Sequence, residues 1–285
     1  MWIADGWKDY ECIDAASGDK LERWGNVRLC RPDPQVIWEK RSAPDAWRKA
    51  DARYNRSSSG GGSWSYTNRI PERWEIKYKD LTFNIKPMGF KHTGLFPEQA
   101  VNWDWMREKI RARGGGKILN LFAYTGGATV ACAKEGAHVT HVDAAKGMVA
   151  WAKENAQSSG VKTENVRYLV DDCMKLVERE IRRGNKYDGI IMDPPSYGRG
   201  PGGEVWKLEE GLWGFVERCT LLLSDDPMFF VINSYTTGLQ PGVLKNIMSL
   251  ALPKGNITAD EIGLPITSSG LVLPCGATGR WEPAQ

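Results

Sequence analysis

Carboxylates follow three apolar runs in the second half of this sequence. Asp143, Asp172 and Asp193 each stand at or next to the end of such a run, and an earlier run leads into Gly126. A carboxylate accepts hydrogen bonds from ribose hydroxyls or amino groups, and glycine lets backbone approach a ligand closely. The order of these residues predicts a nucleoside-shaped binding site.

The glycine pattern is not that of a dinucleotide site. That fingerprint is G-x-G-x-x-G at the start of a helix that holds a pyrophosphate. Here Thr125-Gly126-Gly127 has no third glycine at the required offset. A ligand with ribose and adenine but no phosphate fits better, and S-adenosylmethionine is such a ligand. The glycines alone are more typical of a plain turn, but adding Asp143, Asp172 and the Asp193-Pro194-Pro195 segment reverses this preference.

The first two carboxylate positions each allow a structural and a ligand-binding interpretation. Asp143 either caps a helix predicted to begin near Ala144 or contacts ribose, and its place in a strand–helix–strand unit favours ribose. One residue of Asp171-Asp172 is expected to cap the helix predicted over 173–183, which leaves the other for an adenine amino group. We expect Asp172 to bind the adenine.

The third carboxylate, Asp193, is followed by two prolines, a serine and Tyr197. Because proline lacks an N–H donor and stiffens the chain, we expect the nearby carbonyls to be free to hold a planar amine or base. Asp193, Pro194 and Tyr197 are the predicted catalytic residues. Residues 198–203 are glycine-rich and are predicted to form a mobile loop. Tyr197, just before this loop, and Arg199 within it are predicted to bind the acceptor. A stiffened surface turn is the alternative.

Strand and helix patterns alternate from Lys117 onward, as in a parallel sheet covered by helices on both faces. We predict an α/β fold with a doubly wound, mostly parallel, Rossmann-like sheet. Ligands bind such sheets outside the carboxyl ends of the strands, where all three carboxylates fall. Strands are predicted at 117–122, 138–142, 166–170, 187–192 and 228–232, with late strands at 257–262 and 271–273, and helices at 128–135, 173–183, 204–223 and 239–252.

The N-terminal part has a different composition. Nine of the 13 tryptophans lie in residues 1–105, together with a serine- and glycine-rich stretch at 57–63. A short strand is predicted at 36–40 and a hairpin over 74–85. We predict a small, Trp-rich, mainly β region over 1–90 and a domain that binds S-adenosylmethionine over 91–285. The tryptophans are either a stacking surface for bases or the packing of a small domain.

Composition excludes several classes of protein. The hydrophobic share of 41% and the charged share of 26% are those of a soluble globular chain, and no run of roughly 18 apolar residues suggests a membrane span. Six scattered cysteines without a C-x-x-C pair indicate neither a zinc site nor disulfides, so we expect a cytoplasmic protein without a metal. The net charge of +3 is too small to indicate nucleic-acid binding. Basic runs at 107–117 and 179–186 are interpreted as solvated helix faces.

These motifs together resemble the class I S-adenosylmethionine-dependent methyltransferases. The resemblance is greatest to the bacterial large-subunit ribosomal RNA cytosine-C5 and guanine methyltransferases, and it covers 89–233. It rests on the segment 92–99, which reads HTGLFPEQ, on 120–127, which reads NLFAYTGG, and on the three carboxylate positions.

The resemblance implies a role for each matching residue. Asp193 and Pro194 would face the transferred methyl group, and Asp143 would hold the ribose. The remaining residues would contact other parts of the cofactor: Thr93, Phe96 and Gln99 before the first strand, Phe122, Tyr124 and Gly126 on the methionine side, and Asp172 at the adenine. Thr125, Cys173 and Asp193 are also among the predicted cofactor-binding residues.

One departure from the family concerns the mechanism. The cytosine-C5 enzymes use a cysteine thiolate just after the fifth strand, where this chain has Ser234 and Tyr235. Cys275 is the remaining candidate, but it lies at a different position. We therefore expect direct methyl transfer to RNA, without a covalent cysteine adduct. The alternatives are a protein or small-molecule methyltransferase, or a non-catalytic adenosyl-binding protein.

Overall fold

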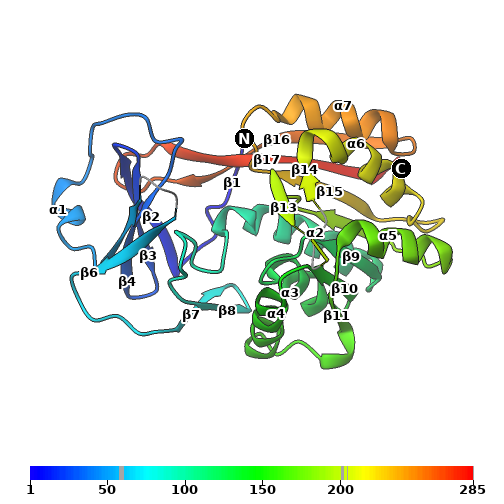
Figure 1. Ribbon diagram of the computed structural model, residues 1–285, viewed down its shortest axis with the longest axis horizontal. Helices are drawn as coiled ribbons and strands as arrows, with labels where there is room; N and C mark the ends of the chain where they lie inside the picture. The colour runs from blue at the N-terminus through cyan, green and yellow to red at the C-terminus, as the bar shows by residue number, and fades with distance from the viewer. Residues whose placement is uncertain (58–60, 200–201, 204, 285) are drawn as a thin grey trace. The chain divides into compact units, whose positions relative to one another are not determined.

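The computed structural model describes residues 1–57, 61–199, 202–203 and 205–284 (Figure 1). The chain forms two compact units. The first unit contains Met1, residues 101–261 and the chain from 276 onward, and the second contains residues 2–100 and 262–275. Residues 91–100 therefore group with the N-terminal part. The predicted domain boundary at residue 90 differs from this division by contacts and stays a prediction.

A mostly parallel sheet forms the centre of the first unit and confirms the predicted α/β fold. Each of the five predicted central strands is present, and these strands pair in parallel. They are β9 (Lys117–Leu121), β10 (His138–Asp143), β11 (Val166–Val170), β12 (Gly189–Met192) and β15 (Phe229–Ser234).

The late strands are longer than predicted. β16 spans Gly255–Pro265 and β17 spans Val272–Pro283, so both contribute residues to each unit. β17 pairs antiparallel with β15, and the short β1 (Trp2–Ile3) pairs parallel with the second-unit part of β16. The full strand order is β1-β16-β17-β15-β12-β9-β10-β11.

The strand order reverses between β9 and β12. Along the chain the sheet grows from β9 through β10 to β11 on one side, and it then continues with β12 and β15 on the other. Leu121 and Met192 are paired at the carboxyl ends of the two strands. Such a switch point is where ligands bind doubly wound sheets. The residues that follow β9 and β12 are thus placed where the sequence predicts a site.

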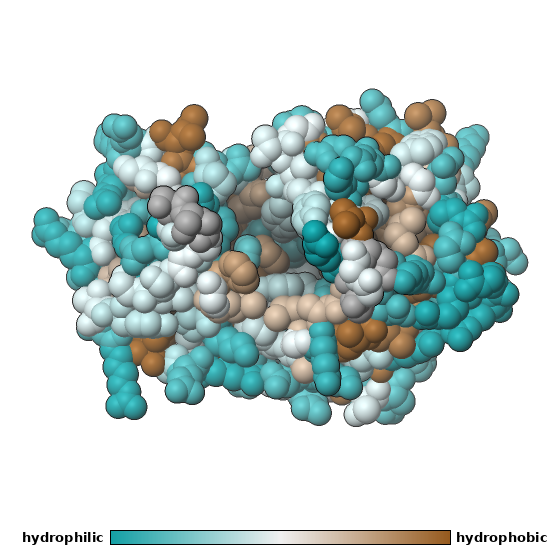
Figure 2. Space-filling model, viewed as in Figure 1, coloured by the Kyte–Doolittle hydropathy of each residue, from teal (hydrophilic) through white to brown (hydrophobic). Residues whose placement is uncertain are grey.

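Helices pack against this sheet through apolar faces. α5 shows the pattern clearly, because Leu176 and Val177 are buried whereas Lys175 and Arg182 are exposed. Hydrophilic side chains cover the surface in the region of α5 (Figure 2). The helices are α2 (Ala100–Arg113), α3 (Gly127–Lys134), α4 (Lys146–Ser158), α5 (Cys173–Arg182), α6 (Leu208–Thr220), α7 (Pro241–Ala251) and a short 3-10 turn at Thr163–Asn165. Across the residues that the structure describes, no helix is both long and apolar enough to cross a membrane.

The basic run before β9 is not a set of free cations. Arg107 and Arg111 both pair with Glu135, and Lys109 pairs with Glu282. These cations stabilise the first unit by pairing with its own carboxylates, so the run gives no support to nucleic-acid binding.

The predicted helix over 204–223 is wrong at its start. Val205–Lys207 forms β14, which pairs antiparallel with β13 (Tyr197–Arg199), and α6 begins only at Leu208. Valine and tryptophan suit an extended chain, and the backbone N–H of Leu208 donates to the Ser196 carbonyl. The predicted mobile loop over 198–203 is therefore partly a hairpin strand. Residues 200, 201 and 204 lie outside the described residues.

The second unit contains a mainly β N-terminal region, as predicted. Its hairpin over 74–85 is confirmed, with Lys79 in the left-handed region at the turn. A separate five-stranded sheet has the order β2-β3-β4-β5-β6. The elements are β2 (Tyr10–Ala16), β3 (Asp19–Trp24), β4 (Val27–Pro32), α1 (Pro44–Trp47), β5 (Ala52–Arg56), β6 (Gly62–Tyr66), β7 (Trp74–Tyr78), β8 (Leu81–Ile85) and a 3-10 turn at Pro97–Gln99.

The strand predicted at 36–40 is wrong. Carbonyls of this segment instead accept hydrogen bonds from the turn between β2 and β3, from Gly18 to Val36 and from Ser17 to Trp38. The prolines before it interrupt regular pairing. Val36 is buried although it belongs to no sheet, so an apolar residue in this segment does not require a strand.

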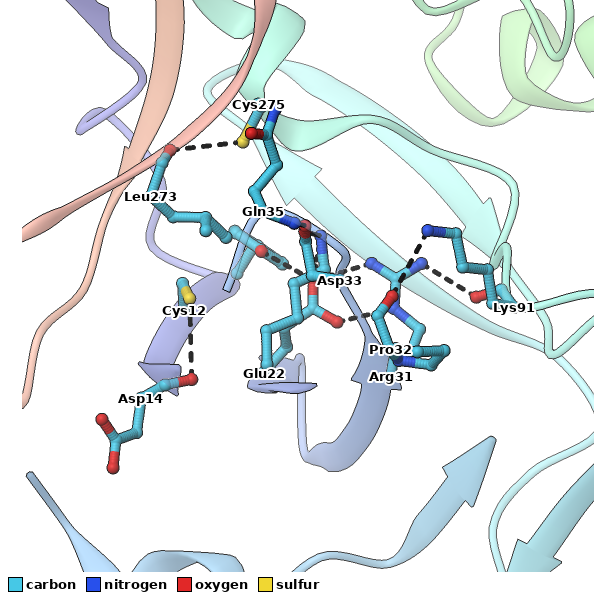
Figure 3. Close-up of polar contacts among 12 residues, drawn as sticks. Cys12, Asp14, Glu22, Arg31, Pro32, Asp33, Gln35, Lys91, Leu273 and Cys275 are labelled. Carbon is cyan, nitrogen blue, oxygen red and sulfur yellow. Dashed lines mark hydrogen bonds and ion pairs between the residues drawn. The ribbon is translucent and has the colours of Figure 1, made fainter. Parts of the chain in front are cut away.

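A buried ion pair lies in the second unit. Glu22 is 0% exposed and accepts hydrogen bonds from Arg31 Nε at 2.6 Å and from the Tyr10 hydroxyl at 2.8 Å. Figure 3 shows Arg31 between Glu22 and Lys91, whose carbonyl accepts from Arg31 Nη1 at 3.0 Å. Burial alone raises the pKa of Glu22, but the charges of Arg31 and Lys20 outweigh it and hold the pKa at about 2.

Candidate active site

The turn after β9 has a strained backbone. Phe122 and Tyr124 have φ angles of 54° and 52°, which non-glycine residues rarely adopt. Two contacts hold these angles: the Phe122 N–H donates to Cys173 Sγ at 3.3 Å, and the Tyr124 N–H donates to Asp143 Oδ2 at 2.8 Å. Backbone strain that the surroundings maintain is concentrated at ligand sites. The turn lies at the switch point, as a ligand-binding segment would.

The glycine pair makes room for neighbouring protein side chains. Gly126 has a φ of 80°, and a Cβ there would lie 2.9 Å from the Cβ of Ala152 on α4. A Cβ on Gly127 would lie 2.7 Å from the indole of Trp103. Asn155, buried on α4, donates to the Thr125 carbonyl at 2.9 Å. The turn is therefore packed firmly against its neighbours.

The Asp143 carboxylate is held by two backbone groups. Besides Tyr124, the N–H of Ala145 donates to its Oδ1 at 2.9 Å, so the side chain closes the turn before α4. Burial raises the pKa of Asp143 in spite of these two bonds. Each carboxylate oxygen has a further lone pair with which to accept a hydrogen bond. The geometry is compatible with the predicted ribose contact, which stays a prediction.

The pair Asp171-Asp172 has two distinct structural roles. Asp172 is the N-cap of α5 and accepts from the Lys175 N–H at 2.9 Å, whereas Asp171 pairs with Arg179. The expectation that one residue caps the helix and the other binds adenine assigned the cap to Asp171, and this is wrong: Asp172, the residue predicted to bind adenine, is the cap. Cys173 is 4% exposed, and its thiol contacts the Phe122 backbone. The adenine role of Asp172 and the cofactor contact of Cys173 stay predictions.

The segment after β12 is anchored on both sides. The Asp193 N–H donates to the Leu121 carbonyl at 3.4 Å, which joins it to the end of β9. The carbonyl of Pro195 accepts from Trp206 Nε1 at 2.7 Å, and Ser196 Oγ lies 2.6 Å from Thr236 Oγ1. The Ser196 carbonyl accepts from the Leu208 N–H, so the carbonyls of Pro195 and Ser196 both accept hydrogen bonds, contrary to the expectation that they are free.

The acceptor residues proposed from the sequence lie at the hairpin. Tyr197 is 54% exposed, and Arg199 is also exposed. Arg199 makes no ion pair with any described residue. An exposed ring and a cation on one short strand can contact a base and a phosphate.

Thr93, Phe96 and Gln99 belong to the second unit. Thr93 is 0% exposed, and its Oγ1 has no hydrogen-bond partner among the described residues. The Phe96 ring packs against His92 at 5.4 Å, and the Gln99 N–H donates to the Phe96 carbonyl. Their cofactor contacts stay predictions.

The sequence indicated no site role for a group of buried polar residues near the turn: His141, Thr129 and Asn120. His141 is 0% exposed, its Nδ1 lies 2.8 Å from Thr129 Oγ1, and Asn120 donates to the same hydroxyl at 2.9 Å. Burial lowers the pKa of His141 to about 3, so it is neutral. The available signal was polar residues inside an apolar strand and helix, among them Asn155 on the buried face of α4.

No cysteine has the properties of a nucleophile. Burial raises the pKa of all six thiols, whereas a reactive cysteine has a lowered one. Cys275 donates to the Leu273 carbonyl at 3.4 Å (Figure 3). Among the described residues, no three His, Cys, Asp or Glu side chains gather as a metal site.

Known proteins resemble this chain along different lengths. A family model described as S-adenosylmethionine-dependent methyltransferase matches residues 44–209. The crystal structure of an S-adenosylmethionine-dependent methyltransferase from Agrobacterium tumefaciens is 34% identical, with a TM-score of 0.94, and the match covers 99% of this chain and 93% of that one.

Curated relatives match a shorter segment. Ribosomal RNA large subunit methyltransferase K/L of Shewanella baltica is 34% identical over 116 residues, which is 40% of this chain and 16% of that protein. A putative ribosomal RNA large subunit methyltransferase of Methanocaldococcus jannaschii is 32% identical over 131 residues, 46% of this chain and 32% of that protein. The chain therefore matches well under two thirds of the length of either relative.

Proposed function

The chain belongs to the S-adenosylmethionine-dependent methyltransferases, and from this premise we propose that RNA accepts the methyl group. The observation that carries the proposal is the similarity to methyltransferases named for large-subunit ribosomal RNA, over 116 and 131 residues. The exposed Tyr197 and Arg199 support it, because a ring stacks on a base and a guanidinium binds phosphate.

The cofactor residues are proposed from their positions at the switch point. Asp143 accepts hydrogen bonds from ribose, Asp172 binds the adenine amino group, and the turn from Phe122 to Gly126 contacts the methionine part. The strained backbone at Phe122 and Tyr124 supports this placement. S-adenosylmethionine supplies a methyl group on a positively charged sulfur. The protein's task is therefore to place a nucleophile in line with that methyl group.

The acceptor side uses the segment after β12. We assign to Asp193 a hydrogen bond from the attacking group of the acceptor, which orients the lone pair of that group. Pro194 fixes the backbone beside Asp193, and Tyr197 stacks on the acceptor ring. Direct transfer fits the raised pKa of all six thiols, since a covalent step would use a thiolate. Orientation and exclusion of water account for most of the expected rate.

A labelling experiment tests the acceptor class. The purified chain is incubated with S-adenosylmethionine carrying a tritiated methyl group and with total RNA or total protein from a strain lacking the gene. We expect label in RNA that nuclease releases, and none with Asp193→Ala. Asp225→Ala, at an exposed carboxylate of the same unit, is the matched control and should behave as wild type.

Other outcomes of the same experiment contradict the proposal. Label that protease releases identifies a protein acceptor. Label in neither fraction, together with cofactor binding by calorimetry, points to a small-molecule acceptor or to a non-catalytic binding protein.

A further inference from the structure

One aromatic side chain joins the two halves of the candidate site. The half-buried Trp206 on β14 donates its indole N–H to the Pro195 carbonyl at 2.7 Å, two residues after Asp193. The same indole packs on Phe122, with ring centroids 5.4 Å apart. Trp206 thus touches the segment after β12 and the turn after β9 at once.

A third ring completes the cluster. Phe215 on α6 is 0% exposed and lies 5.6 Å from both Trp206 and Phe122, with interplanar angles of 72° in each case. Such edge-on arrangements are the favoured geometry of aromatic pairs. Phe215 therefore supports the other two rings from within the core.

A glycine on α6 leaves space for this indole, and a second glycine faces Trp206 across the hairpin. In the hairpin, Gly198 is paired opposite Trp206. On α6, a Cβ at Gly211 would lie 2.9 Å from Trp206 Cζ3, which is closer than such contacts allow. Gly214, three residues further along α6, is exposed, and a Cβ added there would have nothing within 4 Å.

We propose that Trp206 is a positioning residue for methyl transfer. Its N–H fixes the backbone that carries Asp193, and its ring sets the distance of that backbone from the turn at Phe122. Methyl transfer by direct displacement depends on such placement, since an error of about 1 Å can cost about 100-fold in rate. The inference rests on the proposed function for the roles of Asp193 and the turn at Phe122 and for the choice of RNA as the acceptor in the assay.

The test uses two matched pairs of variants. Gly211→Ala pushes a methyl group against the Trp206 ring, whereas Gly214→Ala makes the same change of helix propensity without that contact. Trp206→Phe keeps a ring but loses the N–H, and its control, Trp213→Phe, changes an exposed tryptophan on α6. We expect Gly211→Ala and Trp206→Phe to lower kcat for RNA methylation by about 10-fold or more. The Kd for S-adenosylmethionine should stay within about two-fold of wild type.

A second measurement needs no acceptor. Limited trypsin digestion, mapped by mass spectrometry, reports cleavage between Lys207 and Leu208, where the Leu208 N–H is held by the Ser196 carbonyl. Cleavage should be faster in Gly211→Ala and Trp206→Phe than in the two controls. If each variant matches its control in both kcat and cleavage rate, Trp206 does not position the site.

The two proposals fail separately. Wild-type protein that methylates no RNA contradicts the acceptor proposal, while the digestion still tests Trp206. Wild-type protein that methylates RNA, with variants equal to controls, contradicts only the role of Trp206. Equal losses of thermal stability and activity in Gly211→Ala and Gly214→Ala would identify a merely structural effect.

Discussion

The Asp143 carboxylate accepts a hydrogen bond from the Tyr124 N–H at 2.8 Å, so the end of β10 holds the turn that follows β9. Tyr124 has a φ of 52°, a conformation that costs free energy in a residue with a side chain. The carboxylate offsets part of that cost by pairing with a backbone N–H. Asp143 therefore shapes the turn before any ligand arrives.

Replacing Asp143 by alanine should weaken cofactor binding by about 1.5–3 kcal/mol, as expected when hydrogen bonds to a charged group are lost. Calorimetry with S-adenosylmethionine measures the change, and circular dichroism confirms that the variant is folded. Asp225→Ala is the control for removing an exposed carboxylate. A folded Asp143→Ala protein with wild-type affinity would remove Asp143 from the cofactor site.

Cofactor binding should weaken on acidification at a pH above the ordinary aspartate pKa of 3.8, because burial raises the pKa of Asp143. The effect of this pKa shift on protein stability has the opposite sign. A carboxyl pKa that folding raises stabilises the folded protein below pH 3.8, and this contribution is lost as the pH rises through the raised pKa. Cofactor binding needs the ionised Asp143 carboxylate, so the affinity for the cofactor falls as the pH is lowered. Affinity measured from pH 7 downward checks this, and Asp143→Asn should remove that acid-side dependence.

The parts of this fold that the sequence predicted are those with long, regular patterns. The five central strands are apolar runs, three of which end at or just before an aspartate (Asp143, Asp171 and Asp193), and each is present. The hairpin of β13 and β14 was missed because each strand has three residues, too few to show an alternation. The sequence does not show which of Asp171 and Asp172 caps the helix, since either residue can do so. It therefore could not settle which of the two is left for the adenine. Only the structure shows that Asp172 is the cap.

Replacing Glu22 by glutamine should destabilise the protein by about 3–5 kcal/mol, because it leaves the charge of Arg31 buried without its partner. Arg31 is 6% exposed at its side chain, and Glu22 is 0% exposed. Glu11→Gln is the matched control: its pair with Arg23 is on neighbouring strands but about 30% exposed, so we expect about 0–1 kcal/mol. Urea unfolding measures both, and equal losses would contradict the difference in burial.

The same ion pair predicts a pH dependence. The pKa of Glu22 is held at about 2, below its ordinary 4.5, so its contribution to stability is present above pH 4.5 and lost as pH falls through 2. Glu22→Gln should lack this part of the acid destabilisation.

Replacing Cys275 by serine should leave methyl transfer unchanged. Burial raises the pKa of the Cys275 thiol well above its usual range, and the thiol donates to the Leu273 carbonyl. A thiol held in this way is a poor nucleophile. RNA containing 5-fluorocytosine, which traps cysteine adducts, should give no covalent complex on denaturing gels. An adduct that disappears in Cys275→Ser would restore cytosine-C5 chemistry.

Replacing Arg199 by alanine should weaken RNA binding and make it less sensitive to salt. An arginine on phosphate releases counterions on binding, so losing it should lower the slope of log affinity against log salt by about one unit. Arg182→Ala, at an exposed cation on α5, is the control for loss of one positive charge from the same unit. Filter binding across a salt series measures both variants. A slope that falls equally in the two would mean that only the total charge matters. A slope that falls for Arg199→Ala alone places a phosphate at the hairpin, beside the segment that carries Asp193.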